Sequence, residues 1–130
     1  MTYPTNSQSI DLDYQFSQNG YQGNVNGYQN ERQPQAHLYS NDAKGTNLGH
    51  KFWSFSWQPQ TLGPNQYLIA FLNAPQMNVI SGGWKISHPN DQVFAIESYD
   101  RQLDQWVITL YNASQNTKQV TFTLIAKERS

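Results

Sequence analysis

Apolar and polar residues alternate along much of this chain, most regularly near its end, where residues 104–127 read DQWVITLYNASQNTKQVTFTLIAK. Residues 106–111 and 119–126 are rich in β-branched and aromatic side chains, and a polar connector separates the two runs. This composition is typical of two strands of an antiparallel hairpin. In the second run one face is apolar, which predicts that it is buried; its residues are Val120, Phe122, Leu124 and Ala126.

Two runs are apolar on both faces, which predicts central strands covered on both sides. They are residues 66–72, QYLIAFL, and residues 106–111, where Val107 and Tyr111 are apolar opposite Trp106, Ile108 and Leu110. Further short strands are expected elsewhere, and the run Ser81-Gly82-Gly83 is expected to be a turn between two of them. These further segments are residues 10–16, 36–40, 51–58, 77–80, 84–87 and 93–99.

The strands number about eight or nine, and no window sustains a helical spacing of apolar residues. The sequence therefore predicts an all-β fold, an antiparallel β-sandwich of the jelly-roll kind. We expect one domain over residues 1–130, with a polar lead-in at 1–7 and a long loop or hairpin rich in Asn, Gln, Gly and Tyr at 18–35.

Charge is sparse and balanced, with 8 Lys and Arg against 9 Asp and Glu. A chain without a basic stripe is not expected to bind nucleic acid or to insert into a membrane. Cysteine is absent, so disulfides do not stabilise the fold. The beginning of the sequence lacks the pattern of a classical signal peptide, and we expect an extracellular, cell-surface or virion-associated protein that leaves by another route, with a cytoplasmic location as the alternative.

Amides replace charges in this composition: the sequence has 13 Asn, 16 Gln and 18 aromatic residues. Amide groups are paired donors and acceptors, and aromatic rings are flat apolar platforms. Together they suit uncharged, hydroxyl-rich ligands such as sugars. The alternative is that the amides only keep a β-rich protein soluble.

The favoured candidate site is Trp84 with the polar residues that follow it, His88, Asn90 and Asp91. A Trp ring can stack on the C–H face of a sugar while short polar side chains bind its hydroxyls. The alternative is that Trp84 fills the core and that the polar residues form a plain turn.

Three other aromatic residues are candidates for the same ligand. Tyr21 and Tyr28 occupy equivalent positions in a near-repeat of Asn-Gly-Tyr-Gln, which either displays both rings on a loop or forms an ordinary hairpin. Trp57 shares a face with Trp53 and Phe55, and these rings either pack into the core or form a ligand platform.

Motifs for catalysis are missing, so we do not expect an enzyme. His37, His50 and His88 are widely separated and are expected to be surface groups rather than zinc ligands. No cofactor is expected, although the spacing Asp11-x-Asp13 or the pair Asp100 and Asp104 leaves calcium possible.

The triplet Asn112-Ala113-Ser114 has the form of a glycosylation acceptor, but it is better explained as part of a turn.

The composition and the candidate residues favour a non-enzymatic, lectin-like domain that binds glycans or glycoconjugates and assembles into a homo-oligomer. The alternative hypothesis is a structural or adhesive module of a virion, a fibre or a toxin complex, whose aromatic residues form a subunit interface.

Overall fold

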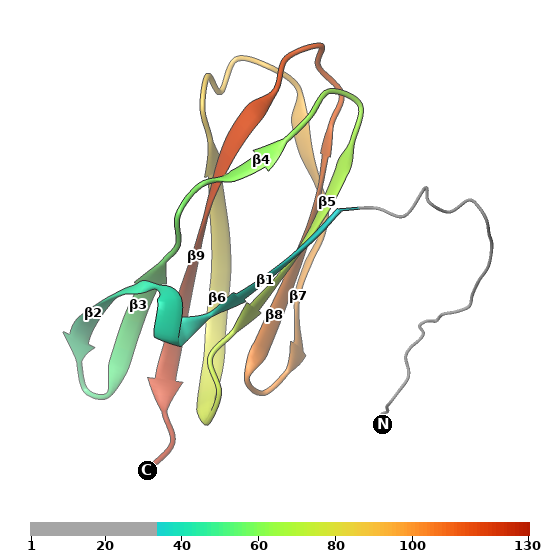
Figure 1. The fold of residues 1–130 in the computed structure, drawn as a ribbon. Helices are drawn as coiled ribbons and strands as arrows, with labels where there is room; N and C mark the ends of the chain where they lie inside the picture. The colour runs from blue at the N-terminus through green and yellow to red at the C-terminus, as the bar shows by residue number, and fades with distance from the viewer. Residues whose placement is uncertain (1–33) are drawn as a thin grey trace. The chain divides into compact units, whose positions relative to one another are not determined.

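The computed structural model describes residues 34–130, which form two β-sheets packed face to face (Figure 1). The four-stranded sheet has the order β1 (Gln35–Tyr39), β5 (Tyr67–Asn73), β8 (Gln105–Asn112), β7 (Val93–Gln102). In the five-stranded sheet β9 (Lys118–Glu128) pairs on one side with β3 (Phe52–Ser56) and β4 (Gln60–Leu62) and on the other with β6 (Met77–Ile86), while β2 (Lys44–Gly49) pairs with β3. A single 3-10 turn, η3 (Ser40–Asp42), lies between β1 and β2.

These nine strands, with no α-helix among the described residues, confirm the predicted all-β sandwich. The expectation that β5 and β8 are central strands is also confirmed, because β5 lies between β1 and β8, and β8 lies between β5 and β7. Residues 1–33 are outside the described part. The expected strand at 10–16 and the loop at 18–35 with Tyr21 and Tyr28 fall there, so these expectations and the extent of the domain stay predictions.

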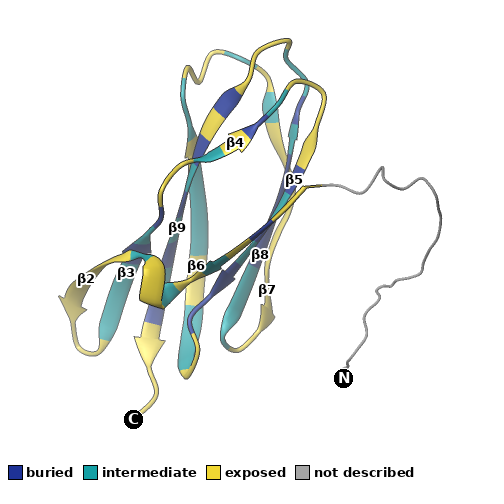
Figure 2. Ribbon diagram, viewed as in Figure 1, coloured by how far each residue is buried: buried dark blue, intermediate teal, exposed yellow. Residues whose placement is uncertain are grey.

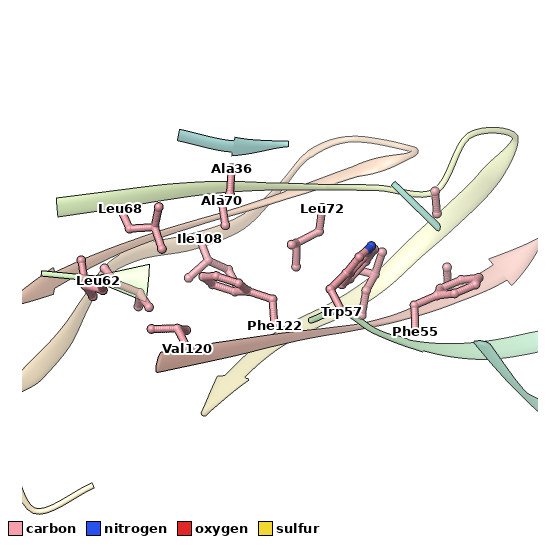
Figure 3. Close-up of a cluster of buried hydrophobic side chains, with 14 residues drawn as sticks. Ala36, Phe55, Trp57, Leu62, Leu68, Ala70, Leu72, Ile108, Val120 and Phe122 are labelled. Carbon is pink, nitrogen blue, oxygen red and sulfur yellow. The ribbon is translucent and has the colours of Figure 1, made fainter. Parts of the chain in front are cut away.

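The predicted closing hairpin is wrong. β8 and β9 lie in opposite sheets, and the residues between them, 113–117, cross the edge of the sandwich. Ile108 of β8 and Val120 and Phe122 of β9 point toward one another across the interior (Figure 3). The apolar faces of the two strands are buried against each other, not side by side, and both arrangements give the same alternating pattern in the sequence.

The predicted turn at residues 81–83 is also wrong, because β6 continues through it as one strand with a bulge between Val79 and Ser81. Gly82 is required for packing: a side chain there would overlap the indole ring of Trp106 on the facing sheet. A glycine inside a strand can mark such a close approach as well as a turn.

One strand pair departs from the expected antiparallel pattern: β1 pairs with β5 in parallel, with Ala36 opposite Ala70. Parallel neighbours need a long crossover connection. Here β2, β3 and β4 supply it, since the chain passes through the five-stranded sheet before it returns as β5.

The core lies between the two sheets and takes side chains from both (Figures 2 and 3). Leu72, Ile108 and Leu110 of the four-stranded sheet and Phe122 and Leu124 of the five-stranded sheet are fully buried. Burial of such side chains is the main stabilising contribution to a sandwich of this size.

Asn112 joins the two ends of the connector after β8. It is fully buried, and its Nδ2 donates to the carbonyl oxygens of Leu62, Gly63 and Asn116, while its Oδ1 accepts from the N–H and hydroxyl of Ser114. The amide is therefore occupied by protein groups. This burial contradicts a glycosylation site at the triplet and agrees with the turn explanation.

Candidate functional site

The predicted site around Trp84 is not assembled as one surface. Trp84 is on the inner face of β6, opposite Phe122 in register, and its partly buried ring packs against the core. His88 and Asn90 are exposed on the loop that follows the strand. The sequence left open whether Trp84 packs in the core or lies under a ligand, and its position on the inner face favours packing.

Asp91 holds the loop between β6 and β7 in place. Its carboxylate forms an ion pair with Lys118, whose side chain is 1% exposed, and also accepts from Nδ2 of Asn116 at 3.0 Å. Lys118 Nζ also donates to the backbone carbonyl of His88 at 2.9 Å. The bonds from Lys118 and Asn116 lower the pKa of the Asp91 carboxyl below its ordinary value. The carboxylate of Asp91 is thus engaged by Lys118 and Asn116 of the protein itself.

Trp57 does not fit the ligand-binding role considered for it. Its side chain is 5% exposed, and its Nε1 donates to the carbonyl oxygen of Tyr39 at 2.9 Å. The ring lies in the core near Phe55, with 6.4 Å between the ring centres (Figure 3). Trp57 is buried because the strand face that it shares with Phe55 points between the sheets.

A different surface gathers aromatic side chains: the outer face of the four-stranded sheet. The register aligns the outward-facing residues in rows across the sheet. On β5 they alternate with buried residues, whereas on β8 the outward-facing Val107 and Thr109 are themselves covered by their neighbours, at 2% and 7% exposed. We call this surface the aromatic face; its apolar and aromatic members are His37, Tyr67, Ile69, Phe71, Phe94, Tyr99, Val107 and Tyr111.

The first row of the aromatic face consists of Tyr67, Tyr111 and Phe94 on the three neighbouring strands β5, β8 and β7. The rings of Tyr67 and Tyr111 are 4.6 Å apart between centres and are tilted by 43°. Phe94 is 51% exposed. The row therefore places aromatic surface and two phenol hydroxyls at one end of the sheet.

The third row runs from His37 through Phe71 and Val107 to Tyr99. The His37 ring is stacked on Phe71 with 4.5 Å between the ring centres, and burial lowers the pKa of the imidazole, which favours its neutral form. Burial, together with the negative charge of Glu97, raises the pKa of Tyr99, so its hydroxyl keeps its proton as a donor.

Polar side chains occupy the second row, between the two aromatic rows. Thr109 donates from its hydroxyl to the carboxylate of Glu97 at 3.3 Å, with Ile69 as the apolar neighbour. Adjacent strands are about 4.8 Å apart and alternate residues about 6.7 Å apart, so the first and third rows lie about 13 Å from each other.

A fourth row is made of hydrogen-bonded polar groups. Gln105 donates to Oδ1 of Asn73 at 2.8 Å and accepts from Nη1 of Arg101 at 2.6 Å. These bonds fix the orientation of both amides at the border of the aromatic face, which gives the surface a defined polar edge.

Sequence reasoning missed this surface, although its signal was present. Val107, Tyr111, Ile69 and Phe71 are apolar on the second face of strands whose first face is already buried. That pattern was interpreted as burial on both sides. This holds for Val107, which is 2% exposed, but Ile69, Phe71 and Tyr111 remain partly exposed, and the neighbouring Tyr67, Phe94 and Tyr99 are exposed.

Within residues 34–130, no three His, Asp or Glu side chains come together to hold a metal ion. The described part contains no helix long and apolar enough to cross a membrane.

The fold and this surface define a β-sandwich domain with one aromatic sheet face. The chain belongs to the YjdH family, whose model matches residues 35–126, from the start of β1 into β9. Searches of curated proteins and of solved structures gave no match. The family description states no activity, so membership in the family identifies the domain but not its function.

Proposed function

We propose that this domain is a non-enzymatic, lectin-like module that binds glycans on the aromatic face. The observation that carries the proposal is the pair of aromatic rows, Tyr67–Tyr111–Phe94 and His37–Phe71–Val107–Tyr99, with hydroxyl and carboxylate groups between them. Ring faces bind the C–H surfaces of sugars, and directed polar groups bind their hydroxyls.

The charge of the face supports a neutral ligand. In its first three rows Glu97 is the charged side chain, and its carboxylate can accept from sugar hydroxyls as well as from Thr109. The separation of about 13 Å between the aromatic rows suits an extended oligosaccharide better than a single sugar ring. Such sites bind weakly one at a time, so we also propose a homo-oligomer that raises affinity by multivalency.

This function fits an extracellular, cell-surface or virion-associated location, where glycans are displayed, and it needs no cofactor. Removal of divalent cations with a chelator tests whether glycan binding needs calcium, for which Asp100 and Asp104 were considered as ligands. Glycan binding is expected to be unchanged by the chelator, and a loss restored by calcium would contradict the cofactor-free proposal.

A glycan-array screen of the labelled protein tests the proposal, followed by heteronuclear NMR titration with each oligosaccharide that binds. Saturable binding with shifted resonances at Tyr67, Phe71 and Tyr99 is expected. Tryptophan emission is a poor reporter here, because Trp57 is buried and Trp84 and Trp106 are on inner faces. A blank array, or shifts confined to the loop at His88, would overturn the placement on this face.

A second candidate function, a structural or adhesive assembly module, is favoured by strand β7. This strand forms the edge of the four-stranded sheet and exposes Phe94, Ile96 and Tyr99, with Ile96 at a bulge (Figure 2). An apolar edge strand is a template for pairing with another chain. Light scattering and glycan titration of Ile96→Lys separate the candidates. Assembly through β7 predicts an oligomer that Ile96→Lys dissociates, whereas binding on the aromatic face, to which Ile96 at the bulge does not belong, predicts that this variant keeps its affinity for a glycan at each site.

A further inference from the structure

We propose that the opposite sheet carries a binding site for a phosphate or sulfate group, in a pocket of about 700 Å³ at the end of β9. The turn between β2 and β3, the start of β6 and the last residues of β9 meet there (Figure 1). Lys51, Lys127 and Arg129 line the pocket from two separate segments, with His50 and Asn78 beside them. This site is independent of the glycan-binding proposal.

The strand register places the cations on one side of the sheet. Lys127 lies opposite Phe52 on β3 and Asn78 on β6, and its Nζ is 5.4 Å from the centre of the Phe52 ring. Its neighbour Ala126 points into the core, so Lys127 and Arg129 point to the outer surface.

The pocket also has one acidic side chain, Glu128, whose single negative charge is outnumbered by the three cations and whose Oε2 is engaged by Trp53. Glu128 alternates with Lys127 toward the inner face, where its Oε2 accepts from Nε1 of Trp53 at 2.6 Å. Within residues 34–130 the ion pair found is that of Asp91 and Lys118, so no carboxylate of the described part pairs with the three cations of the pocket. Their charge is available to an anionic ligand.

Two donors of the pocket are held in fixed orientations. Arg129 donates from Nε to Oδ1 of Asn78 at 2.8 Å and from Nη2 to the carbonyl oxygen of Met77 at 3.2 Å, which leaves Nη1 free of these bonds. Because the Asn78 oxygen accepts from Arg129, its Nδ2 is oriented as a second donor. A guanidinium fixed in this way suits the oxygens of phosphate and sulfate.

The backbone of the turn is strained on this side of the pocket. Gly49, His50 and Lys51 have φ angles of 89°, 56° and 73°, all in the left-handed region. His50 and Lys51 hold this conformation against the preference of non-glycine residues, and the N–H of Glu128 donates to the Lys51 carbonyl at 2.9 Å. The turn therefore places Lys51 beside the end of β9.

The test is NMR titration of the intact chain with inorganic sulfate and inorganic phosphate, and with chloride at matched ionic strength. Saturable shifts at Lys51, Asn78, Lys127 and Arg129 are expected with both oxyanions and not with chloride. Lys127→Gln and Arg129→Gln should each weaken binding at least tenfold. Equal effects of chloride, or unchanged binding in both variants, would overturn the site.

Lys85→Gln is the matched control, because Lys85 is an exposed lysine on the outer face of the same sheet, opposite Thr121 and about 20 Å along β9 from Lys127. Lys85→Gln should leave oxyanion binding unchanged. An equal loss of binding in this variant would mean that the net charge of the protein, and not the pocket, determines oxyanion binding, and this would overturn the site. A parallel titration with a sulfated monosaccharide identifies the source of the group. Tighter binding than sulfate assigns a sugar-borne anion, and equal binding assigns the free ion.

Discussion

Gly82 of β6 lies directly against the indole ring of Trp106 of β8, and this contact joins the two sheets. An atom at the Cβ position of Gly82 would lie 2.6 Å from Nε1 and 2.8 Å from Cγ of the ring, closer than nonbonded atoms approach. The ring is also held by a hydrogen bond that its Nε1 donates to the hydroxyl of Ser98 at 2.9 Å. The ring therefore has no room to move away from β6 without losing this bond.

Gly82→Ala is expected to lower the free energy of unfolding by about 1–3 kcal/mol, because the added methyl group overpacks the interface between the sheets. Urea denaturation measures the change. Gly83→Ala is the control, since a Cβ there would meet Oγ1 of Thr123 at 3.0 Å, a small side chain that can rotate. A larger loss at Gly83 than at Gly82 would contradict the role assigned to Trp106.

Asp91→Asn is expected to destabilise the protein more than Lys118→Met. The first change leaves a buried ammonium group without its counter-charge, whereas the second leaves a carboxylate that water can reach. The midpoints of urea denaturation compare the two variants. If Lys118→Met lowered the stability more than Asp91→Asn, the hydrogen bonds and packing of the lysine side chain, and not the ion pair, would be what stabilises the loop.

The same pair makes the protein lose stability in acid. Because the folded pKa of Asp91 lies below its unfolded value of 3.8, the unfolded state binds the proton first as the pH falls. The contribution is complete above the unfolded pKa and is lost as the pH falls through the folded one. Asp91→Asn should therefore show a shallower loss of stability in this range than the wild-type protein.

His37 should make the protein less stable as the pH falls below neutrality. Burial against Phe71 lowers the folded pKa of the imidazole below 6.5, so between the two values the unfolded state binds more protons and the free energy of unfolding decreases with falling pH. Thermal unfolding at several values between about pH 5.5 and 7.5 measures this slope. His37→Gln should flatten the slope, and an unchanged slope would exclude His37 as its origin.

Asn112→Ala is expected to cost on the order of 3 kcal/mol of stability, because it leaves several buried carbonyl and N–H groups without their partner. Asn90→Ala, at an exposed loop position, is the control and should cost little. Equal costs measured by urea denaturation would mean that the buried network is not needed.

The alternating pattern predicted most strands of the described part but not their partners. Residues 106–111 and 119–126 are strands as expected, yet they pack face to face in different sheets. A period of two identifies the buried face of a strand without saying whether the partner lies beside it or across the core. The long-range parallel pairing of β1 with β5 has no local signal at all.

The candidate site was predicted less well than the fold, for a physical reason. Trp84 was the favoured candidate and Trp57 a further one, because both are large aromatic residues near strand ends. Large rings stabilise a sandwich most when they are buried, and both pack inward. The aromatic face comes from residues far apart in the sequence, such as Tyr67, Tyr99 and Tyr111, which meet only because β5, β7 and β8 are neighbours.

Tyr67→Ala and Tyr99→Ala remove one ring from each aromatic row, and both residues are exposed, at 39% and 41%. Each change should weaken glycan binding by a few-fold to about tenfold, since a stacked ring contributes on the order of 0.5–1.5 kcal/mol and about 1.4 kcal/mol corresponds to tenfold in affinity. The fold should stay intact, with unfolding midpoints close to that of the wild-type protein.

The most direct measurement is therefore the affinity of a glycan selected on the array for the wild-type protein, Tyr67→Ala, Tyr99→Ala and the loop control Asn90→Ala, determined by NMR titration. Binding that is weakened in both tyrosine variants and kept in the loop variant is the expected result. Binding that survives both tyrosine changes and is lost with Asn90→Ala would contradict a glycan site on the aromatic face.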